Sequence, residues 1–412
     1  MNIRFLGGAQ EVGRSAIILN EELLLDYGIK PTDPPTYPSN GLRPKTVIIS
    51  HGHLDHCGLV PNLMDLGPEV YCTSITAKLS ALLARDTLKI AGKKGHVIPY
   101  YNEEIQEFER KVRVKGYRKE FNTNGYSVSF YDAGHIPGSS MIHIEKEKQS
   151  LFYTGDLNTI RTELQKGADT DFPQSDTLLI ESTYFGRNHT PRKILEERFI
   201  KSIRETIEIG GRAIIPAFGI GRTQEIMLIL KKHGLPAFVD GMGVDVFNIL
   251  KRSPEYVNDI NKLEKAFTST NIVKWEDRES IINKPSIIVT SAGMLNGGPV
   301  FYYIDEIYND PKSKIFLTGY QAEDTNGRSA LTRGYIVNGQ RTIHLNCRLE
   351  LYDFSAHCGD FQLKEVVKDF CDNGTETVIA IHGDNTEGFA DWIREEMGVK
   401  SFAPANGEMI SI

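Results

Sequence analysis

Residues 46–58 read TVIISHGHLDHCG, an apolar stretch followed at once by a cluster of histidine and aspartate residues. The β-branched and apolar residues at its start are typical of a buried strand. His51 and His53 are two positions apart, so an extended loop would point both side chains the same way. Asp55 and His56 are adjacent and therefore suit a second ion better than the first. Imidazole and carboxylate groups are ligands that zinc accepts, so this stretch predicts a two-metal site at the end of a strand.

Three more apolar strands stop at a potential metal ligand beside a glycine. His135 follows a strand in YDAGHIPGSS, Asp156 ends LFYTGD, and His382 follows the apolar part of ETVIAIHGD. A turn residue explains any one of them, but a single site at the edge of the sheets explains all three together. Asp26, in ELLLDYG, ends a strand in the same way. Because this carboxylate lies deep in apolar sequence, we expect it to orient a ligand histidine.

The composition is that of an ordinary globular protein. The chain has 412 residues, of which 40% are hydrophobic and 25% charged, so its length suggests about two or three domains. The apolar runs are too short to span a bilayer, and the N-terminal MNIRFLGG contains no signal-peptide core, so we expect no membrane association. The five cysteines are scattered and form no CxxC pair, which favours a reducing cytoplasm over a disulfide framework.

The charge argues mildly against a protein that coats nucleic acid, because the formal net charge is −7. Residues 85–119 nevertheless hold ten Lys or Arg residues against five Asp or Glu residues. A solvated helix face explains this local excess, and so does a groove that follows phosphate groups.

HGHLDH resembles the HxHxDH signature of the metallo-β-lactamase superfamily. The order Asp26, HGHLDH, His135, Asp156 is similar to that of the superfamily's first four motifs. The remainder of the chain resembles the β-CASP nuclease branch, which has an acidic residue after a strand and a Ser-Ala-His motif. Here these are Glu181 in LLIESTYFGR and His357 in YDFSAHCGD.

A third β-CASP motif falls on His382, a position that is His in RNA-processing members and typically Val in DNA-processing members. Within the branch, the chain is similar to RNase J and to archaeal relatives of the cleavage and polyadenylation specificity factor (CPSF) endonuclease. It resembles their short type, without KH domains. The resemblance therefore extends over the whole chain.

The resemblance implies a four-layer αββα metallo-β-lactamase fold with an inserted β-CASP domain. The succession of strand, loop and helix from about residue 185 onward, as in RAIIPAF followed by GIGRTQEIMLILKKHG, predicts a doubly wound α/β domain there. We therefore expect metallo-β-lactamase segments at residues 1–183 and 342–412 on either side of a β-CASP domain at residues 184–341.

The resemblance also implies a role for each candidate residue. Two Zn²⁺ ions would share seven ligands: His51, His53 and His135 on the first, Asp55, His56 and His382 on the second, and Asp156 bridging both. His357 would be the general acid for the leaving 3′-oxygen, and Glu181 would fix its tautomer. The alternatives are a structural histidine at a domain junction and a carboxylate at a helix start.

Two glycine-containing loops are candidates for binding the RNA backbone. FGIGRTQE (218–225) holds Gly219, Gly221 and Arg222 ahead of a helix, and SAGMLNGG (291–298) holds Ser291 and Gly293 after a strand. Glycines allow close backbone approach and a helix start offers N–H donors, and by resemblance both loops line the RNA channel. A tight strand-to-helix turn explains the first loop equally well.

GAQEVGRS (8–15) nearly matches the phosphate-binding loop GxxxxGK[ST], with Arg14 in place of Lys. Such a loop should open a helix, yet AIILN, which follows it here, is typical of a strand. We therefore reject a nucleotide site at this loop.

These features predict a zinc-dependent ribonuclease that hydrolyses single-stranded RNA by two-metal in-line attack and leaves 5′-phosphate and 3′-hydroxyl ends. The residues do not decide between endonuclease and 5′→3′ exonuclease action. The rivals are a catalytically inactive RNA-binding subunit, a hydrolase of small esters or thioesters, and a DNA nuclease. The full ligand set, the long insertion and His382 argue against them in turn. A homodimer is expected from the family alone.

Overall fold

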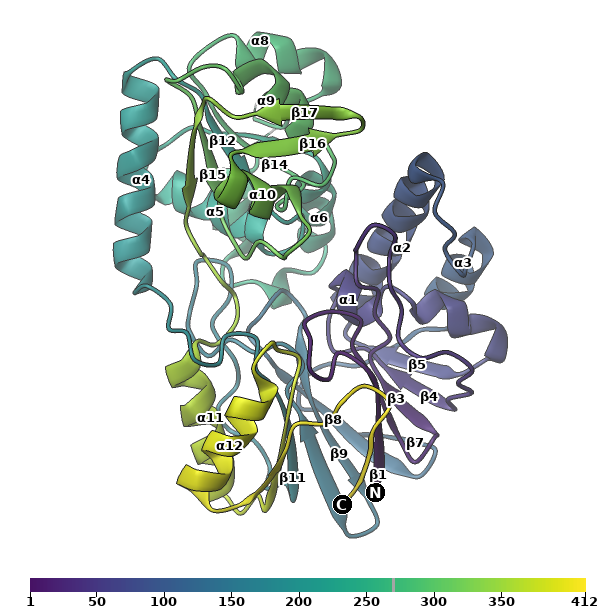
Figure 1. Cartoon of the computed structure of the whole chain (residues 1–412). Helices are drawn as coiled ribbons and strands as arrows, with labels where there is room; N and C mark the ends of the chain where they lie inside the picture. The colour runs from purple at the N-terminus through teal and green to yellow at the C-terminus, as the bar shows by residue number, and fades with distance from the viewer. Residues whose placement is uncertain (269–270) are drawn as a thin grey trace. The chain divides into compact units, whose positions relative to one another are not determined.

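The computed structural model describes residues 1–268 and 271–412, which divide into two compact units (Figure 1). Unit 1 comprises Met1–Arg161, Gly167–Asn188 and Ala356–Ile412, and unit 2 comprises Thr162–Lys166 and His189–Ser355. The chain thus leaves unit 1 and returns to it. These units are defined by packing, and the three motif-based segments 1–183, 184–341 and 342–412 remain a proposal.

Unit 1 contains two seven-stranded sheets. The first has the order β21-β1-β2-β3-β4-β5-β6, formed by Met409–Ser411, Asn2–Gly7, Ala16–Leu19, Leu23–Leu25, Thr46–Ile48, Glu69–Cys72 and Arg113–Val114. The second has the order β20-β19-β11-β10-β9-β8-β7, formed by Lys400–Phe402, Thr377–Ile381, Thr177–Glu181, Gln149–Tyr153, Ser140–Lys146, Tyr126–Asp132 and Phe121–Thr123.

The two sheets share a core, and helices cover their outer faces. Alternate side chains of both sheets, such as Phe5 of β1 and Ile142 of β9, lie in one buried cluster. The outer face of the first sheet packs on α1 (Leu54–Cys57), α2 (Ser74–Lys94) and α3 (Asn102–Lys111). That of the second packs on α11 (Asp360–Asp372) and α12 (Thr386–Met397), on the opposite side of unit 1 (Figure 1). This is the expected αββα order.

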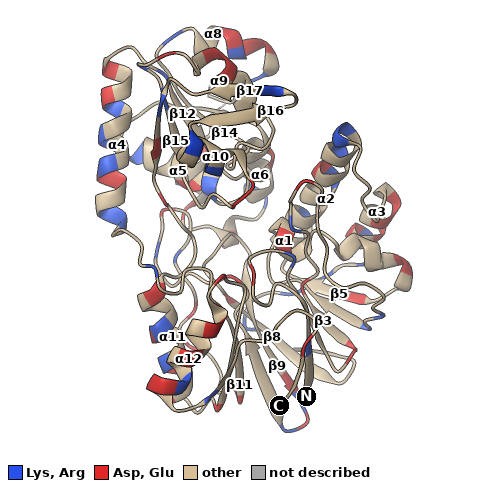
Figure 2. Ribbon diagram, in the orientation of Figure 1, with Lys and Arg blue, Asp and Glu red and all other residues tan. Residues whose placement is uncertain are grey.

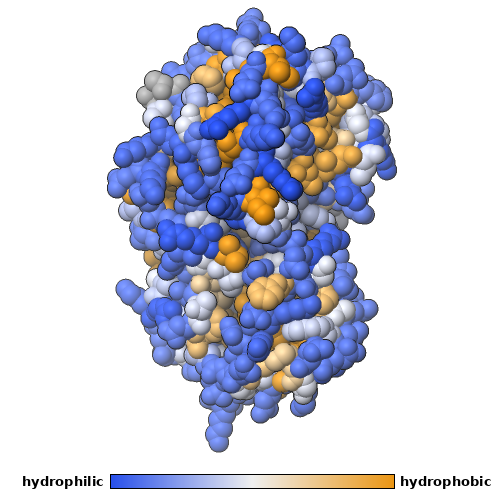
Figure 3. Space-filling view, turned by 90° about the vertical axis from the view of Figure 1, so that its left-hand side faces the viewer, coloured by the Kyte–Doolittle hydropathy of each residue, from blue (hydrophilic) through white to orange (hydrophobic). Residues whose placement is uncertain are grey.

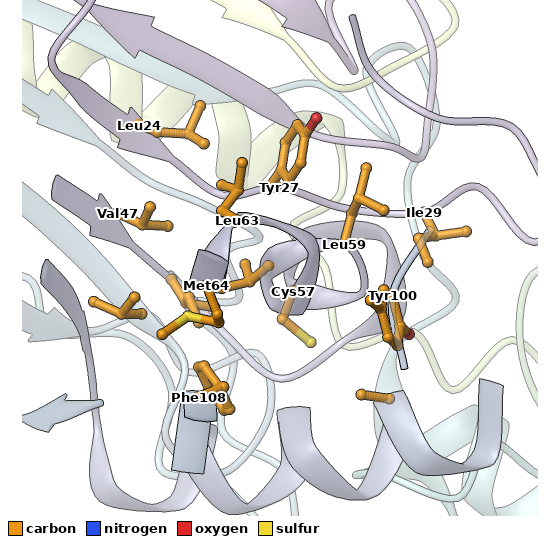
Figure 4. Packing of buried hydrophobic residues seen from close by; sticks show 14 of the residues in the cluster. Leu24, Tyr27, Ile29, Val47, Cys57, Leu59, Leu63, Met64, Tyr100 and Phe108 are labelled. Carbon is orange, nitrogen blue, oxygen red and sulfur yellow. The ribbon is translucent and has the colours of Figure 1, made fainter. Parts of the chain in front are cut away.

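Figure 4 shows the packing on the outer face of the first sheet. Val47 of β4 lies in one cluster with Met64, in the 3₁₀ helix Val60–Leu66, and with Phe108 of α3. Cys57 is 1% exposed in the same cluster, as expected for a small packing residue. Full burial of a valine, methionine or phenylalanine side chain contributes about 1.5–3 kcal/mol. The packing holds α1, which carries two candidate metal ligands, against the sheet.

Unit 2 is built around a five-stranded sheet of parallel pairs in the order β13-β14-β12-β15-β18. Its strands are Phe238–Asp240, Ile287–Thr290, Ala213–Pro216, Lys314–Leu317 and Arg348–Leu351, and β16 (Tyr335–Asn338) pairs separately with β17 (Arg341–His344). Its helices are α4 (Arg192–Glu208), α5 (Arg222–Lys232), α6 (Met242–Leu250), α7 (Ile260–Ala266), α8 (Arg278–Ile282), α9 (Val300–Ile307) and α10 (Asn326–Arg333).

Helices cover both faces of the unit 2 sheet. Ile315 of β15 lies in a cluster with Ile304 of α9. The next residue, Phe316, points to the other face, where its ring centroid lies 5.8 Å from that of Phe199 in α4. A parallel sheet covered on both faces is a doubly wound α/β arrangement, which confirms the predicted fold class.

Candidate metal centre

Strands of both sheets in unit 1 carry the candidate residues to one edge. In the second sheet, β8, β10, β11 and β19 run in the same direction. His135, Asp156, Glu181 and His382 lie at or just beyond the carboxyl ends of these strands. In the first sheet, the parallel strands β3 and β4 end just before Asp26 and the HGHLDH stretch. The carboxyl ends of strands that run the same way meet at one edge, which brings these distant positions together.

The first cluster consists of His51, His53, His135 and Asp156, with one ligand atom from each lying within 4.8 Å of all the others. Nδ1 of His53 lies 3.0 Å from Nε2 of His135. Nε2 of His51 and Nε2 of His135 each lie 3.5 Å from Oδ2 of Asp156. The structure therefore brings together the four residues expected around the first ion.

The second cluster consists of Asp55, His56 and His382, again within 4.8 Å of one another. Nε2 of His56 lies 3.2 Å and Nε2 of His382 lies 3.6 Å from Oδ1 of Asp156. Asp156 thus presents one carboxylate oxygen to each cluster. This is the arrangement that a bridging ligand requires.

Four atoms of the two clusters are buried and make no hydrogen bond of normal geometry among residues 1–268 and 271–412, although two of them, Nε2 of His56 and Oδ1 of Asp156, lie close together. The four atoms are Nε2 of His51, His56 and His382, and Oδ1 of Asp156. A buried polar atom left without a partner costs about 1–3 kcal/mol. Metal cations between the clusters would satisfy these lone pairs together, and the nitrogen and oxygen donors suit zinc. The residues present therefore fit a metal centre.

The electrostatics of the clusters favour the same occupant. Burial lowers the pKa of His51 well below its usual value and that of His53 to about 4. Both rings are therefore neutral, the form that binds a metal. Burial also lowers the pKa of His56, but the negative charges of Asp156 and Asp26 outweigh burial and raise it well above the usual value. The surroundings of His56 thus attract positive charge.

Asp26 lies behind the second cluster, is fully buried, and accepts four hydrogen bonds. The donors are the backbone N–H and the hydroxyl of Ser50, each at 2.7 Å, the Tyr153 hydroxyl at 2.7 Å, and Nδ1 of His56 at 2.8 Å. The Ser50 hydroxyl also lies 3.0 Å from Nδ1 of His51. These contacts suit the orienting role expected for Asp26. Our reading of the sequence missed Ser50 and Tyr153, whose one signal was their nearness to His51 and Asp156 along the chain.

His357 lies beside the metal clusters and is held by Glu181. Nδ1 of His357 is 2.9 Å from one Glu181 carboxylate oxygen and 3.1 Å from the other, and Nε2 is 3.9 Å from Oδ2 of Asp156. Glu181 also accepts a hydrogen bond of 2.7 Å from the Leu157 backbone N–H. Burial lowers the pKa of His357, but the charges of Glu181 and Asp156 outweigh it and raise the pKa to about 9. The geometry therefore presents a protonated imidazole next to the candidate metal ligands.

Three domain families match the chain in this order: "Metallo-beta-lactamase superfamily" over residues 23–183, "Beta-Casp domain" over residues 223–329, and "Zn-dependent metallo-hydrolase RNA specificity domain" over residues 342–404. The chain is 37% identical over 425 residues to RNase aCSPSF2 of Saccharolobus solfataricus, an alignment that covers 100% of this chain and 85% of that protein. It is also 37% identical over 432 residues to Probable RNase MJ4 of Methanocaldococcus jannaschii, covering 100% of each.

This chain belongs to the β-CASP branch of the metallo-β-lactamase superfamily. The resemblance predicted from the motifs is confirmed, and the protein is a metal-dependent hydrolase of that branch. A crystal structure of a protein of unknown function from Enterococcus faecalis V583 has a TM-score of 0.63, with 100% of this chain and 99% of that chain covered. At 13% identity, this likeness supports the fold alone.

The residues of this β-CASP protein expected to bind RNA lie in unit 2, at the carboxyl ends of two neighbouring strands. Gly219, Gly221 and Arg222 follow β12, while Ser291 and Gly293 follow β14. A Cβ atom on Gly293 would lie 2.9 Å from the Phe218 backbone nitrogen, so this glycine lets the two loops pack together. Gly221 has φ 77° at the start of α5, which is the tight turn considered as the alternative. A role in RNA binding remains a proposal for these loops.

Ion pairs neutralise much of the basic segment 85–119 of the β-CASP protein. Acidic and basic residues are interspersed along α2 and α3 in Figure 2. The pairs include Arg85–Glu109, Lys94–Asp33 and Arg113–Glu69. Of the two interpretations of this segment, the solvated helix surface is the one that the contacts favour.

Within the described part of the β-CASP chain, no helix is both long and apolar enough to cross a membrane. Figure 3 shows one face of the molecule, on which hydrophilic residues cover most of the surface and hydrophobic residues gather in separate groups. Exposed apolar groups of this kind are ordinary on protein surfaces.

Proposed function

We propose that this protein is a zinc-dependent ribonuclease that hydrolyses phosphodiester bonds of single-stranded RNA and leaves 5′-phosphate and 3′-hydroxyl ends. The observation that carries the proposal is the position of Asp156, whose two carboxylate oxygens face different ligand clusters while His357 lies next to the same side chain. The matched RNA specificity domain and the two RNases among the relatives support RNA as the substrate.

In this proposal the chain holds two Zn²⁺ ions, with the ligands divided as the two clusters are: His51, His53 and His135 for one, Asp55, His56 and His382 for the other, and Asp156 for both. Bound zinc lowers the pKa of a water molecule to about 7 and polarises phosphoryl oxygens. The chain contributes neutral imidazoles, a shared carboxylate, and Asp26, which keeps His56 turned toward the second cluster.

His357 is the general acid in this proposal. With its pKa raised to about 9, it is protonated at neutral pH and can give the Nε2 proton to the leaving 3′-oxygen. Glu181 accepts the Nδ1–H bond, which fixes the orientation of the ring and stabilises its positive charge. Arg222 and the loops with Gly219, Gly221, Ser291 and Gly293 would contact the RNA backbone through N–H groups and charge.

The cellular setting is also part of the proposal. All five cysteines are free thiols, which agrees with a reducing cytoplasm. The homodimer expected from the resemblance stays a prediction, which light scattering coupled to size-exclusion chromatography can test.

The test is to incubate zinc-loaded protein with single-stranded RNA labelled at either end, carrying a 5′-monophosphate or a 5′-triphosphate, with Asp156→Ala as the control. Mononucleotides released from monophosphorylated RNA alone would identify a 5′→3′ exonuclease. Internal fragments that do not depend on the 5′ end would identify an endonuclease. RNA that is bound without Asp156-dependent cleavage would refute the proposal and favour an inactive RNA-binding subunit. Hydrolysis of a small thioester with RNA left intact would favour the small-molecule hydrolase.

A further inference from the structure

The loop Gly8–Ser15, called here the N-terminal loop, connects β1 and β2 and lies against a candidate metal ligand. The backbone N–H of His382 points at two of its carbonyl groups, those of Gly8 at 2.9 Å and Ala9 at 3.0 Å. His382 has φ 50°, a left-handed conformation that costs a residue with a Cβ atom about 1–3 kcal/mol. The N-terminal loop therefore helps to hold the backbone of His382 in an unfavourable conformation.

Ser15, the last residue of the N-terminal loop, contacts two members of the second cluster. Its hydroxyl oxygen lies 2.9 Å from Nδ1 of His382. Its backbone N–H donates a 2.8 Å hydrogen bond to the carbonyl oxygen of Asp55. Ser15 is 4% exposed, so these contacts are shielded from bulk solvent. One buried residue, Ser15, thus links the HGHLDH stretch to His382, which lies 367 positions after Ser15 in the chain.

The contact with His382 has a direct chemical meaning. When Nδ1 of His382 carries the hydrogen and donates a hydrogen bond to the Ser15 hydroxyl oxygen, the lone pair of the ring lies on Nε2. Nε2 is the atom that is buried without a hydrogen-bond partner in the described structure and that faces Asp156. A hydrogen bond from the ring nitrogen that does not bind the metal fixes both the tautomer and the orientation of a metal-binding histidine.

Two histidines of the first cluster have other supports. Nδ1 of His51 lies 3.0 Å from the Ser50 hydroxyl, and Nδ1 of His135 lies 2.7 Å from the Ala356 carbonyl oxygen. Within residues 1–268 and 271–412, the hydrogen bonds between the N-terminal loop and the two clusters reach only His382 and Asp55. The loop therefore acts on one cluster and not on the other.

The N-terminal loop is itself held by contacts with Lys30 and with Asn406, near the two ends of the given sequence. Glu11 accepts from Arg14 at 2.7 Å and from Lys30 at 2.7 Å. The Asn406 side chain accepts from the Ala9 backbone N–H at 3.1 Å and donates to Glu11 at 2.9 Å. Ser15 is thus presented by an anchored loop, as a positioning residue requires.

We infer that Ser15 is a positioning residue of the second metal site, acting on His382 as Asp26 acts on His56, and that it sets the affinity for the second ion separately from the first. The inference rests on the proposed two-metal function. It also gives a role to the GAQEVGRS stretch, whose likeness to a nucleotide-binding loop is misleading, because the strand β2 follows it.

The experiment measures metal binding, without RNA, on the full chain. Metal-free wild type, Ser15→Ala and Ser15→Thr are titrated with Zn²⁺ in competition with a chelator, and with Co²⁺ while its visible absorption is recorded. Ser401→Ala is the matched control, because Ser401 is also buried and its hydroxyl has no hydrogen-bond partner in the described structure. Far-UV circular dichroism follows the folding of each variant.

For Ser15→Ala we expect the first equivalent to bind as in the wild type and the second to bind about 10–100-fold more weakly, with an altered Co²⁺ spectrum for that equivalent alone. Ser15→Thr keeps the hydroxyl and should restore the second equivalent, and Ser401→Ala should bind both. Equal weakening of both equivalents, unchanged binding, loss of folding, or a threonine variant that behaves like alanine would each overturn the inference. A wild type that binds two equivalents without cleaving RNA would refute the proposed function alone.

Discussion

Nδ1 of His135 donates a hydrogen bond of 2.7 Å to the carbonyl oxygen of Ala356, the residue directly before His357. The Ser-Ala-His segment therefore positions a candidate metal ligand through its backbone and carries the candidate general acid in its next side chain. The hydrogen bond from Nδ1 to this carbonyl fixes the orientation of the His135 ring. Nε2 of the ring therefore faces the first cluster. Changes to this segment should thus be judged by metal content as well as by activity.

Replacement of His357 by alanine should lower kcat by about 10²–10⁴-fold, because the leaving oxygen loses its proton donor. Zinc content should stay at the wild-type level, since Nδ1 bonds to Glu181 and not to a cluster histidine. Single-turnover cleavage and elemental analysis measure the two effects. Glu181→Gln, which retains the shape of the side chain, should give a smaller loss of rate. Release of zinc from His357→Ala would instead make His357 a metal ligand.

Asp26→Asn should weaken zinc binding by about 10–100-fold, although Asp26 belongs to neither cluster. The amide offers one oxygen in place of the two that accept from Ser50, Tyr153 and His56. Competition with a chelator gives the affinity. Tyr153→Phe removes one of the donors and should weaken binding less than Asp26→Asn does. Equal effects of the two substitutions would mean that the hydroxyl of Tyr153, and not the histidine contact, dominates the role of Asp26.

Gly28→Ala should destabilise the protein by at least about 1–3 kcal/mol, the usual cost of overpacking. A Cβ atom there would lie 1.7 Å from the Asp55 carbonyl oxygen, so the backbone of the second cluster must move. Gly92→Ala is the matched control, because Gly92 lies inside α2 with nothing within 4 Å of a new Cβ atom. That substitution should stabilise the protein by about 0.5–1 kcal/mol. Urea unfolding compares the two, and a Gly28→Ala protein as stable as the wild type would contradict the close packing.

Asp240→Ala should lower the unfolding free energy by about 1–3 kcal/mol, because it leaves the partly buried Arg278 and the buried Tyr303 hydroxyl without their shared acceptor. Asp240 accepts from Arg278 at 2.7 Å and from the Tyr303 hydroxyl at 2.7 Å, and it is 4% exposed. Asp305→Ala, which breaks the exposed pair with Arg341, should cost about 0–1 kcal/mol. Both residues lie in unit 2, so one unfolding transition compares them. Similar losses for the two variants would contradict the distinction between buried and exposed pairs.

Arg222→Ala should weaken the binding of single-stranded RNA to a similar degree for every sequence tested. It should also reduce the slope of log affinity against log salt by about one, as expected when a phosphate contact is lost. Fluorescence anisotropy with the Asp156→Ala protein measures binding without cleavage. Zinc content should not change, because Arg222 lies in unit 2 and the clusters lie in unit 1. An unaltered salt slope would remove Arg222 from the proposed RNA contacts.

The sequence was sufficient to predict the residues that the two clusters bring together. The first residues of TVIIS form the strand β4, as expected. The apolar strands that end near His135, Asp156 and His382 were recognisable because strand-end signals are local. The αββα order was implied by the resemblance of these motifs to the metallo-β-lactamase superfamily. These features depend on residues that are close together in the chain.

Contacts between distant segments left no such signal. Ser15 and His382 meet across 367 positions, so neither residue's neighbours indicate the other. Similarly, β18 lies beyond residue 341 but pairs with β15 inside unit 2. β18 is the edge strand of its sheet, and its short, partly exposed RLEL sequence is not the continuous apolar run of a central parallel strand. The supports of the centre are thus non-local, whereas its candidate ligands were recognisable one by one.

The order of the cluster residues along the chain has a consequence for protein synthesis. HGHLDH is synthesised before any part of unit 2, whereas His357 and His382 come after the whole of unit 2. The strand β19, which ends directly before His382, pairs with β11 on one side and with the later strand β20 on the other. A nascent polypeptide therefore has an incomplete second cluster until His382 has been added, and it lacks the candidate acid until His357 has been added. The candidate metal centre is therefore complete only after residue 382 has been synthesised, when the whole of unit 2 has already been made.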